Sequence, residues 1–466
     1  MPLALDIAQR ACAMRYEDLP PAAIHWAKVG LLDYIGVTLA GSTEPAPRLA
    51  LAALGAPGVG PSALFGAARR LNALDAAVVN GTASHALDFD DCNNTFGGHP
   101  SAPLLPALFA LADELGATGR EFILAYVTGF EVETKIALGV HFHHYTKGWH
   151  PTATLGTFGA AAACSKLMGL DEARTATALA IAASLASGIK ANFGTMVKPL
   201  HVGHCTRNGL YAARLAAAGF TANPDSVFEH KQGFFNVFNG EGKYDAARVL
   251  ERWAAPLDIV EPGIAIKQYP CCGSTHSALD AMLALVREHD FKANDVDRID
   301  VWTHPRRLEH TNRPEPKSAL DAKFSVQYCL ARAATDRRIM IEHFEGEAYR
   351  DPGVQKLLAR VRAAPYGTDR FPADNHFGAE VQVHTRDGAT LTGKVDQPFG
   401  RTSANPLTQE RLKDKFDNCA ARILAPEAVA GIYAAVERFE DLNDVRAVTA
   451  LACRDASPAE RSARAA

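Results

Sequence analysis

The sequence lacks the cysteine spacing on which metal clusters depend. Its nine cysteines are scattered over 466 residues, none belongs to a C-x-x-C motif, and Cys271 and Cys272 are adjacent. An iron–sulfur cluster needs several suitably spaced thiolates, so we expect no such cluster here. An odd number of dispersed cysteines is also typical of thiols that stay reduced in a cytosol. The sequence therefore predicts a cytoplasmic protein.

Long apolar runs and an excess of one charge are also absent. No uninterrupted apolar run reaches the roughly 20 residues that cross a membrane. Acidic residues appear early, at Asp6, Glu17 and Asp18, which argues against a signal peptide. Lys and Arg number 48 against 52 Asp and Glu, a net charge of -4. We therefore expect neither a membrane nor nucleic acid as a partner, and an anionic substrate would need a locally basic pocket.

The composition is suited to a large buried core, since 48% of the residues are hydrophobic. Residues 1 to about 262 show mostly helical periodicity. Ala22–Ala40 is an apolar-periodic run that ends at Gly41. The alanine-rich runs Thr152–Gly169 and Asp171–Gly188 predict central, closely packed helices, the second with an aspartate as its N-cap.

The pattern changes after Pro262. Asp297–Thr303 alternates like a strand, and Glu380–His384 and Thr390–Val395 alternate on either side of the turn signal Thr385–Gly388. Helical runs lie between these strands, at Ser274–Glu288, Ser318–Ala334 and Val354–Ala363. From Pro406 onward the periodicity is helical again.

These patterns predict a mainly α protein with an inserted, smaller α+β domain. We expect a helical domain over residues 1–262, completed by residues 403–455, and the α+β domain over residues 263–402. The small and polar residues 456–466 are expected to form a disordered tail.

Two short segments place a His-Pro dipeptide directly before an apolar helix. The first holds His85 and the acidic run Asp88–Asp91 and continues to His99, and the second contains His150. A helix N-terminus offers free N–H groups and the positive end of a dipole to an anion. We interpret both turns as corners of an anion site. The alternative for the first is an exposed acidic turn with a capping aspartate.

Two further segments combine ionisable residues with glycine and proline. Gly194–His204 contains Lys198 before a proline, and a fixed ammonium group there is suited to binding a carboxylate. The alternative is a lysine that reaches from a loop into solvent. Ile266–His276 ends in Ser274-Thr275-His276, in which Ser274 is expected to cap the following helix. His276 would then lie in the first turn of that helix, a position that favours a neutral imidazole, which can act as a base. A capping region with a surface histidine is the alternative.

Three neighbouring histidines, His141, His143 and His144, raise the question of a metal site. They lie in one short run without the ligand spacing that zinc sites show. We therefore expect a polar loop at this place rather than a metal centre.

Taken together and in this order, the four segments resemble the MmgE/PrpD family. The resemblance runs from about Leu19 to the helix after Pro406. Members of the family include 2-methylcitrate dehydratase, cis-aconitate decarboxylase and an iminodisuccinate epimerase. The resemblance implies a helical domain with the α+β piece inserted as a lid, a homodimer, no metal or other cofactor, and a small polycarboxylate substrate.

The resemblance also assigns site residues on the helical domain. Asp88 matches the first aspartate of the family's D-F-D-D segment, and His99 matches the histidine of its H-P-S segment. His150 matches the second His-Pro turn, and Lys198 matches the lysine of the G-T-x-x-K-P-L-H segment. We expect His99 to transfer protons and Asp88 to orient an imidazole. We expect Lys198 and His150 to bind the substrate's carboxylates.

On the lid, His276 matches the histidine that follows Ser-Thr, and Tyr328 matches a tyrosine of the lid helix. We expect His276 to complete the proton-transfer pair and Tyr328 to donate a hydrogen bond. The chain departs from the decarboxylase after D-F-D-D, where Cys92 stands in place of a threonine and adds a substrate-binding candidate. The spacing to the next histidine is one residue longer, and Thr95 is available to supply the hydroxyl.

The predicted activity is that of a lyase. It either dehydrates a 2-methylcitrate-like tricarboxylate or decarboxylates an unsaturated one, and all such reactions move a proton beside carboxylates. Two alternatives stay open. One is an isomerase that epimerises an amino-dicarboxylate such as iminodisuccinate, and the other is a non-catalytic paralogue that only binds carboxylates.

Overall fold

The structure is a computed structural model, and it describes residues 1–453. The chain forms two compact units, Met1–Ile266 with the C-terminal segment from Gln409 onward, and Lys267–Thr408. Both boundaries lie slightly later in the chain than the sequence suggests. Helix accounts for 58% and strand for 8%, which confirms the mainly α fold with a smaller sheet-containing domain. The disordered tail expected over residues 456–466 lies outside the described residues.

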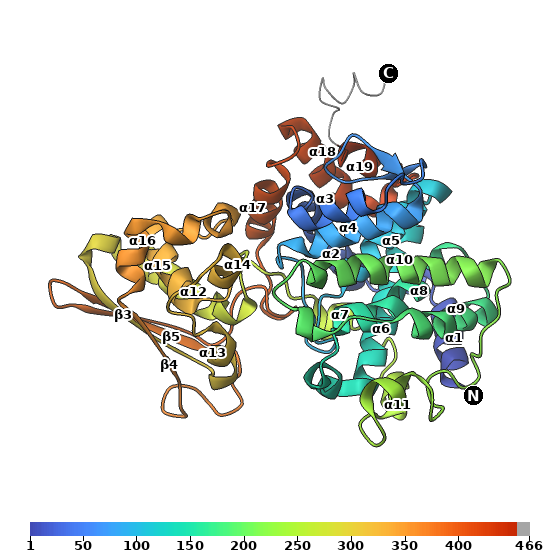
Figure 1. The fold of residues 1–466 in the computed structure, drawn as a ribbon, viewed down its shortest axis with the longest axis horizontal. Coiled ribbons are helices and arrows are strands. Elements are labelled where there is room, and N and C mark those ends of the chain that lie inside the picture. The colour runs from blue at the N-terminus through green and yellow to red at the C-terminus, as the bar shows by residue number, and fades with distance from the viewer. Residues whose placement is uncertain (454–466) are drawn as a thin grey trace. The chain divides into compact units, whose positions relative to one another are not determined.

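The first unit is built from helices (Figure 1). Its N-terminal part contains α1 (Leu3–Ala13), α2 (Pro21–Gly41), α3 (Pro45–Ala53), α4 (Ala73–Ala86), α5 (Ser101–Leu115), α6 (Gly119–Lys147), α7 (Pro151–Thr154), α8 (Gly156–Leu167), α9 (Glu172–Leu185), α10 (Val197–Ala217) and α11 (Phe234–Asn239). The C-terminal segment adds α17 (Gln409–Ala420), α18 (Pro426–Glu437) and α19 (Arg446–Leu451). The short strands β1 (Ser62–Ala63) and β2 (Arg70–Leu71) pair antiparallel. None of the helices described is long and apolar enough to cross a membrane.

Small residues let the central helices of this unit approach each other closely. α10 packs against both α4 and α8. A Cβ atom on Gly81 would lie 3.0 Å from the Cα of Gly203, and one on Gly209 would lie 2.4 Å from the Cβ of Ala160. Larger side chains at these positions would push the helices apart. The close packing matters because α4 and α10 carry residues of the candidate site.

The alanine-rich runs form helices, but with a break. The expected helix over Thr152–Gly169 is divided into α7 and α8 at Leu155. The second run begins as predicted, because the Asp171 side chain accepts a hydrogen bond from the Arg174 N–H at 2.8 Å. α9 then ends at Leu185, shortly before Gly188, whose φ of +121° lies in the left-handed region.

The second unit combines a four-stranded sheet with helices. The strand order is β4-β3-β5-β6, with β3 (Val296–Thr303), β4 (Val361–Pro365), β5 (Ala379–Thr385) and β6 (Thr390–Val395). β3 and β4 run parallel, and the other pairs are antiparallel. The helices are α12 (His276–His289), α13 (Pro305–Thr311), α14 (Ala319–Lys323), α15 (Val326–Asp336) and α16 (Pro352–Leu358). The β5–β6 hairpin turns where predicted, with Gly388 at a φ of +92°.

Three local predictions for this unit are wrong. The helix expected over Val354–Ala363 ends at Leu358, and Val361–Pro365 instead pairs with β3, a long-range contact that helical periodicity does not reveal. The helix expected over Ser318–Ala334 is broken where the Ser325 side chain caps α15. Ser274 does not cap α12, which begins at His276 without a side-chain cap, because its hydroxyl is bound elsewhere.

Candidate active site

The candidate site on the first unit gathers ionisable side chains from four places in the chain. His85 lies in the last turn of α4, and the loop that follows it carries Asp88 and Asp90. His99 precedes α5, His150 is the N-cap of α7, and Lys198 and His201 lie in the first turns of α10.

Asp90 holds two imidazoles with a single oxygen atom. Its Oδ2 lies 2.8 Å from His85 Nδ1 and 3.1 Å from His99 Nδ1. Burial alone would raise the pKa of Asp90, but the two histidines hold it well below its usual value. A carboxylate only accepts hydrogen bonds, so both Nδ1 atoms carry a proton. Asp90 thereby keeps a proton on Nδ1 of both rings.

His99 is held in its charged form. Burial would lower the pKa of this imidazole, but Asp90 and then Cys92 outweigh burial and raise the pKa to about 10. Its backbone N–H donates to Thr152 Oγ1 at 3.1 Å, which fixes the loop before α5. Its Nε2 lies 3.6 Å from Asp88 Oδ1. At neutral pH His99 is therefore a proton donor rather than a base.

His85 is held in its neutral form. Burial is the main cause that lowers its pKa to about 4, against the attraction of Asp90. Its ring centroid lies 4.5 Å from that of His99 and 5.6 Å from that of His150. The outer nitrogen Nε2 is buried and has no hydrogen-bond partner among residues 1–453. His85 therefore presents an unoccupied acceptor within the cluster.

Lys198 and Asp88 form an ion pair at the edge of the cluster. Lys198 Nζ lies 2.6 Å from Asp88 Oδ1, and both side chains are largely but not fully buried. Asp88 has a φ of +54°, which is uncommon for a residue with a side chain. This conformation turns the chain away from the axis of α4, and the Asp88 side chain contacts Lys198 on α10. The ammonium of Lys198 is thus held in place before any substrate binds.

His150 contacts a histidine of the lysine segment. Its Nδ1 lies 3.3 Å from the Nδ1 of His201, so one ring donates and the other accepts. Burial, with the repulsion of His85 and Lys198, lowers the pKa of His150 well below its usual value. The pKa of His201 is also lowered, mainly by burial. Both rings are therefore neutral near pH 7.

Side chains behind the cluster fix the acidic run. Ser101 at the start of α5 donates from its hydroxyl to Asp91 and contacts the Tyr126 hydroxyl at 2.5 Å. Burial is the main cause that raises the pKa of Asp91 well above its usual value. From α17, Lys415 Nζ donates to the Phe89 carbonyl oxygen at 2.8 Å. The C-terminal helices thus help to hold the loop that carries Asp88 and Asp90.

Cys92 stands next to the charged imidazole. Its Sγ lies 3.8 Å from His99 Nδ1, and its backbone pairs with Ala265. Thr95 makes no hydrogen bond to the histidine cluster in the part of the chain that the structure describes. The thiol, rather than the Thr95 hydroxyl, therefore lies where a side chain can influence His99.

A metal ion would find ligand atoms in this cluster. One ligand atom each of His85, Asp88, Asp90 and His99 lies within 4.8 Å of the others. These groups already compensate one another, since Asp88 pairs with Lys198 and Asp90 pairs with two imidazoles. Metal independence stays a prediction.

The sequence predicts a polar loop at residues 141–144, but the structure places this run in the last part of α6. The helix is kinked there, because His141 has a φ of +51°. His144 Nδ1 lies 3.0 Å from Asn239 Oδ1, and its Nε2 lies 2.7 Å from Thr154 Oγ1. His143 Nε2 lies 3.1 Å from the Asn239 carbonyl oxygen. Both rings join α6 to α11, which is a structural role.

The two predicted lid residues belong to the second unit. His276 Nε2 lies 3.3 Å from the Cys271 carbonyl oxygen, and its ring packs edge-on against Tyr269 at 5.1 Å. Tyr328 is fully buried; its hydroxyl donates to the His343 carbonyl oxygen and accepts from Arg332 Nε at 2.9 Å. Tyr328 therefore has its hydrogen bonds satisfied within its own unit.

The structure thus brings five of the seven predicted residues together on the first unit: Asp88, Cys92, His99, His150 and Lys198. It also adds three that the sequence left unassigned, namely His85, Asp90 and His201. His85 and Asp90 are in the same segment as Asp88, so their charge density was visible in the sequence. Their pairing depends on a backbone turn at Asp88 that was not.

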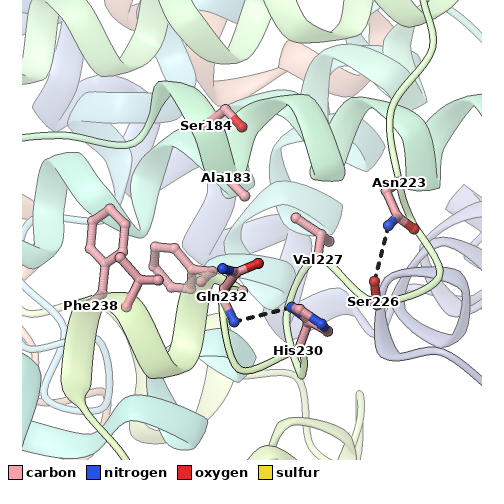
Figure 2. A pocket seen from close by; sticks show the side chains of 11 residues that line it. Ala183, Ser184, Asn223, Ser226, Val227, His230, Gln232 and Phe238 are labelled. Atoms are coloured by element: carbon pink, nitrogen blue, oxygen red, sulfur yellow. Dashed lines mark hydrogen bonds between the residues drawn. The ribbon is translucent and has the colours of Figure 1, made fainter.

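A separate cavity of about 410 Å³ lies on the first unit (Figure 2). It is lined by residues of α9, such as Ala183 and Ser184, and by residues 223–238. His230 is the ionisable residue of its lining, and its Nδ1 accepts from the Gln232 N–H at 3.1 Å. None of the predicted site residues lines this cavity.

A buried set of imidazoles, carboxylates and one ammonium, with several shifted pKa values, is typical of the active site of an enzyme. The chain belongs to the MmgE/PrpD family, because residues 5–247 match the MmgE/PrpD N-terminal domain and residues 269–441 match the MmgE/PrpD C-terminal domain. This confirms the resemblance seen in the four segments.

Three relatives are similar to this chain over most of its length. Cis-aconitate decarboxylase of Homo sapiens is 34% identical over 394 residues, which cover 82% of this chain and 80% of the relative. Cis-aconitate decarboxylase of Aspergillus terreus is 26% identical over 462 residues, which cover 94% of each chain. The cis-aconitate decarboxylase-like protein oryM of Aspergillus oryzae is 27% identical over 459 residues, again 94% of each. A decarboxylase is a carbon–carbon lyase, so the predicted enzyme class is confirmed.

Proposed function

We propose that this protein is a lyase that removes carbon dioxide from a small unsaturated tricarboxylate, with cis-aconitate as the leading candidate. The observation that carries the proposal is the charged His99, held by Asp90 beside the Lys198–Asp88 pair. The relatives named as cis-aconitate decarboxylases support the choice of reaction and of substrate.

Decarboxylation breaks the bond between a carboxylate carbon and its neighbour, and the electron pair stays on the substrate. That pair must then take up one proton at carbon. His99 is suited to supply it, because the pKa of about 10 keeps the imidazole charged at neutral pH. The proton leaves from Nε2, since Nδ1 is held by Asp90, and His99 then regains a proton from solvent.

Lys198 is suited to bind a carboxylate that stays on the substrate. Its ammonium is fixed by Asp88 at 2.6 Å, so its position is set before binding. A bound substrate carboxylate would share the Lys198 ammonium with Asp88, so that Lys198 donates hydrogen bonds to both carboxylates. The neutral rings of His150 and His201 are suited to donate a hydrogen bond without adding charge.

His276 and Tyr328 remain proposed site residues on the evidence of the family resemblance. The contacts of Tyr328 within the second unit favour a supporting role for this residue over direct contact with substrate. A homodimer that needs no cofactor is likewise proposed from the resemblance, and a cytoplasmic location is proposed from the dispersed cysteines.

A turnover screen with purified protein tests the proposal. The candidate substrates are cis-aconitate, 2-methylcitrate, citrate and iminodisuccinate, incubated in deuterated water without added metal and followed by mass spectrometry. We expect cis-aconitate to lose carbon dioxide and to gain one deuteron at carbon. Loss of water from 2-methylcitrate would assign a dehydratase instead, and α-deuteron exchange without loss of mass would assign an epimerase. Binding without turnover of any of them would contradict the enzyme assignment.

A further inference from the structure

A guanidinium group in the second unit has no carboxylate partner among the residues that the structure describes. Arg307 lies on α13; its Nε–H donates to the His376 carbonyl oxygen, and its Nη1 donates to Ser274 Oγ at 3.2 Å. Both acceptors are neutral. A guanidinium has about five N–H donors, so the remaining donors of Arg307 have no acceptor among residues 1–453. Its positive charge is balanced by no ion pair in that part of the chain.

A second arginine lies against the same aromatic ring. The Cζ atom of Arg307 is 4.2 Å from the centroid of Phe377, and the Cζ atom of Arg401 is 4.5 Å from it. Burial, followed by the repulsion of Arg401, lowers the pKa of Arg307 to about 10. Two cations brought this close repel each other and have lost part of their hydration. An anion bound at this place would relieve both effects.

Ser274 and His310 fix the orientation of the guanidinium. Ser274 Oγ accepts from Arg307 and lies 3.0 Å from His310 Nε2. Because a guanidinium cannot accept, the Ser274 hydroxyl proton points to His310. Burial, with the repulsion of Arg307, lowers the pKa of His310, which keeps that ring neutral and able to accept. The hydroxyl that was expected to cap α12 thus holds Arg307 in one orientation.

We propose that Arg307, with Arg401 beside it, binds a carboxylate group of a small di- or tricarboxylate. The free N–H groups of a planar guanidinium match the two oxygens of a carboxylate. The choice of ligand class rests on the proposed function, whereas the anion site rests on the contacts of Arg307. Inorganic phosphate shares the same recognition chemistry and serves as the competing probe.

Calorimetry on the full-length protein tests the site. The ligands are propane-1,2,3-tricarboxylate, which is saturated and is not expected to react, and inorganic phosphate. R307Q is the test variant, and R306Q is the matched control, because Arg306 is the exposed neighbour on α13. We expect R307Q to weaken tricarboxylate binding by roughly 10-fold or more and R306Q to leave it within about 2-fold. Equal affinity in R307Q and the native protein, or tighter binding of phosphate than of tricarboxylate, would overturn the proposal.

A measurement on the native protein covers the case in which R307Q does not fold. Phenylglyoxal modifies accessible arginines, and peptide mapping by mass spectrometry locates the modified residues. We expect the tricarboxylate to protect Arg307 and not Arg306. An Arg307 that does not react, or reacts equally with and without ligand, overturns the site. Arg307-dependent binding without turnover of any substrate would refute the proposed function alone, and turnover with ligand binding unaffected by R307Q would refute the site alone.

Discussion

His99 Nδ1 lies 3.1 Å from Asp90 Oδ2, and this contact decides the protonation state of the candidate catalytic histidine. The same oxygen lies 2.8 Å from His85 Nδ1. One buried carboxylate therefore serves two rings with opposite outcomes, since the pKa of His99 is raised to about 10 and that of His85 is lowered to about 4. The difference leaves His99 protonated on both nitrogens, whereas His85 keeps its Nδ1 proton and leaves Nε2 as an empty acceptor.

Replacing Asp90 by Asn should lower the pKa of His99 toward the ordinary histidine value of about 6.5. A proton donor works only while it is charged, so native activity should fall as the pH rises through about 10. In D90N that falling limb should move toward neutral pH, and turnover at pH 8 should drop by ~10- to 100-fold. A pH–rate profile measures the shift. D171N is the matched control, since Asp171 caps α9 and Asn caps equally well; an unmoved limb in D90N would contradict the role of Asp90.

Replacing Lys198 by Gln should act mainly on substrate binding. The ammonium contacts Asp88 and is proposed to hold a carboxylate, so KM should rise by roughly 10-fold or more with a smaller change in kcat. Steady-state kinetics separates the two constants. The exposed Lys243 provides the control variant K243Q, which should behave like the native protein. A K198Q protein with native KM would remove Lys198 from the carboxylate site.

Replacing His85 by Gln should change how stability depends on pH. The folded pKa of His85 is about 4, below the ordinary value, so the unfolded chain takes up its proton first as the pH falls. The stability that the neutral ring provides is therefore complete above about pH 6.5 and is lost as the pH falls toward 4. Urea unfolding between pH 7 and pH 4 should show a shallower loss in H85Q than in the native protein. Parallel curves for the two proteins would mean that His85 is not held neutral by the fold.

Chelation should leave activity unchanged. Asp88 and Asp90 are already paired with Lys198 and with imidazoles, although the cluster offers four possible ligand groups. Dialysis against EDTA, followed by elemental analysis and a turnover assay, measures both metal content and its consequence. Activity that disappears with the metal and returns on adding a divalent cation would show that the cluster is a metal centre.

The sequence was informative where the signal is local. Asp88, His99 and Lys198 stand out because their short segments combine ionisable residues with glycine or proline. The β5–β6 hairpin could be predicted from its turn residues. The pairing of Asp90 with two histidines depends on the positive φ of Asp88 and on the packing of α4 against α5. Likewise, β4 forms because the edge of β3 accepts it, a contact that no short window of sequence contains.

The most direct measurement is the turnover of cis-aconitate by H99Q in deuterated water, with H143Q as the control at a structural histidine. If His99 delivers the proton that replaces carbon dioxide, H99Q should keep its fold by circular dichroism and lose turnover by ~100-fold or more. H143Q should remain close to the native rate. A folded H99Q that forms deuterated product at the native rate would contradict the assignment of His99 as the proton donor.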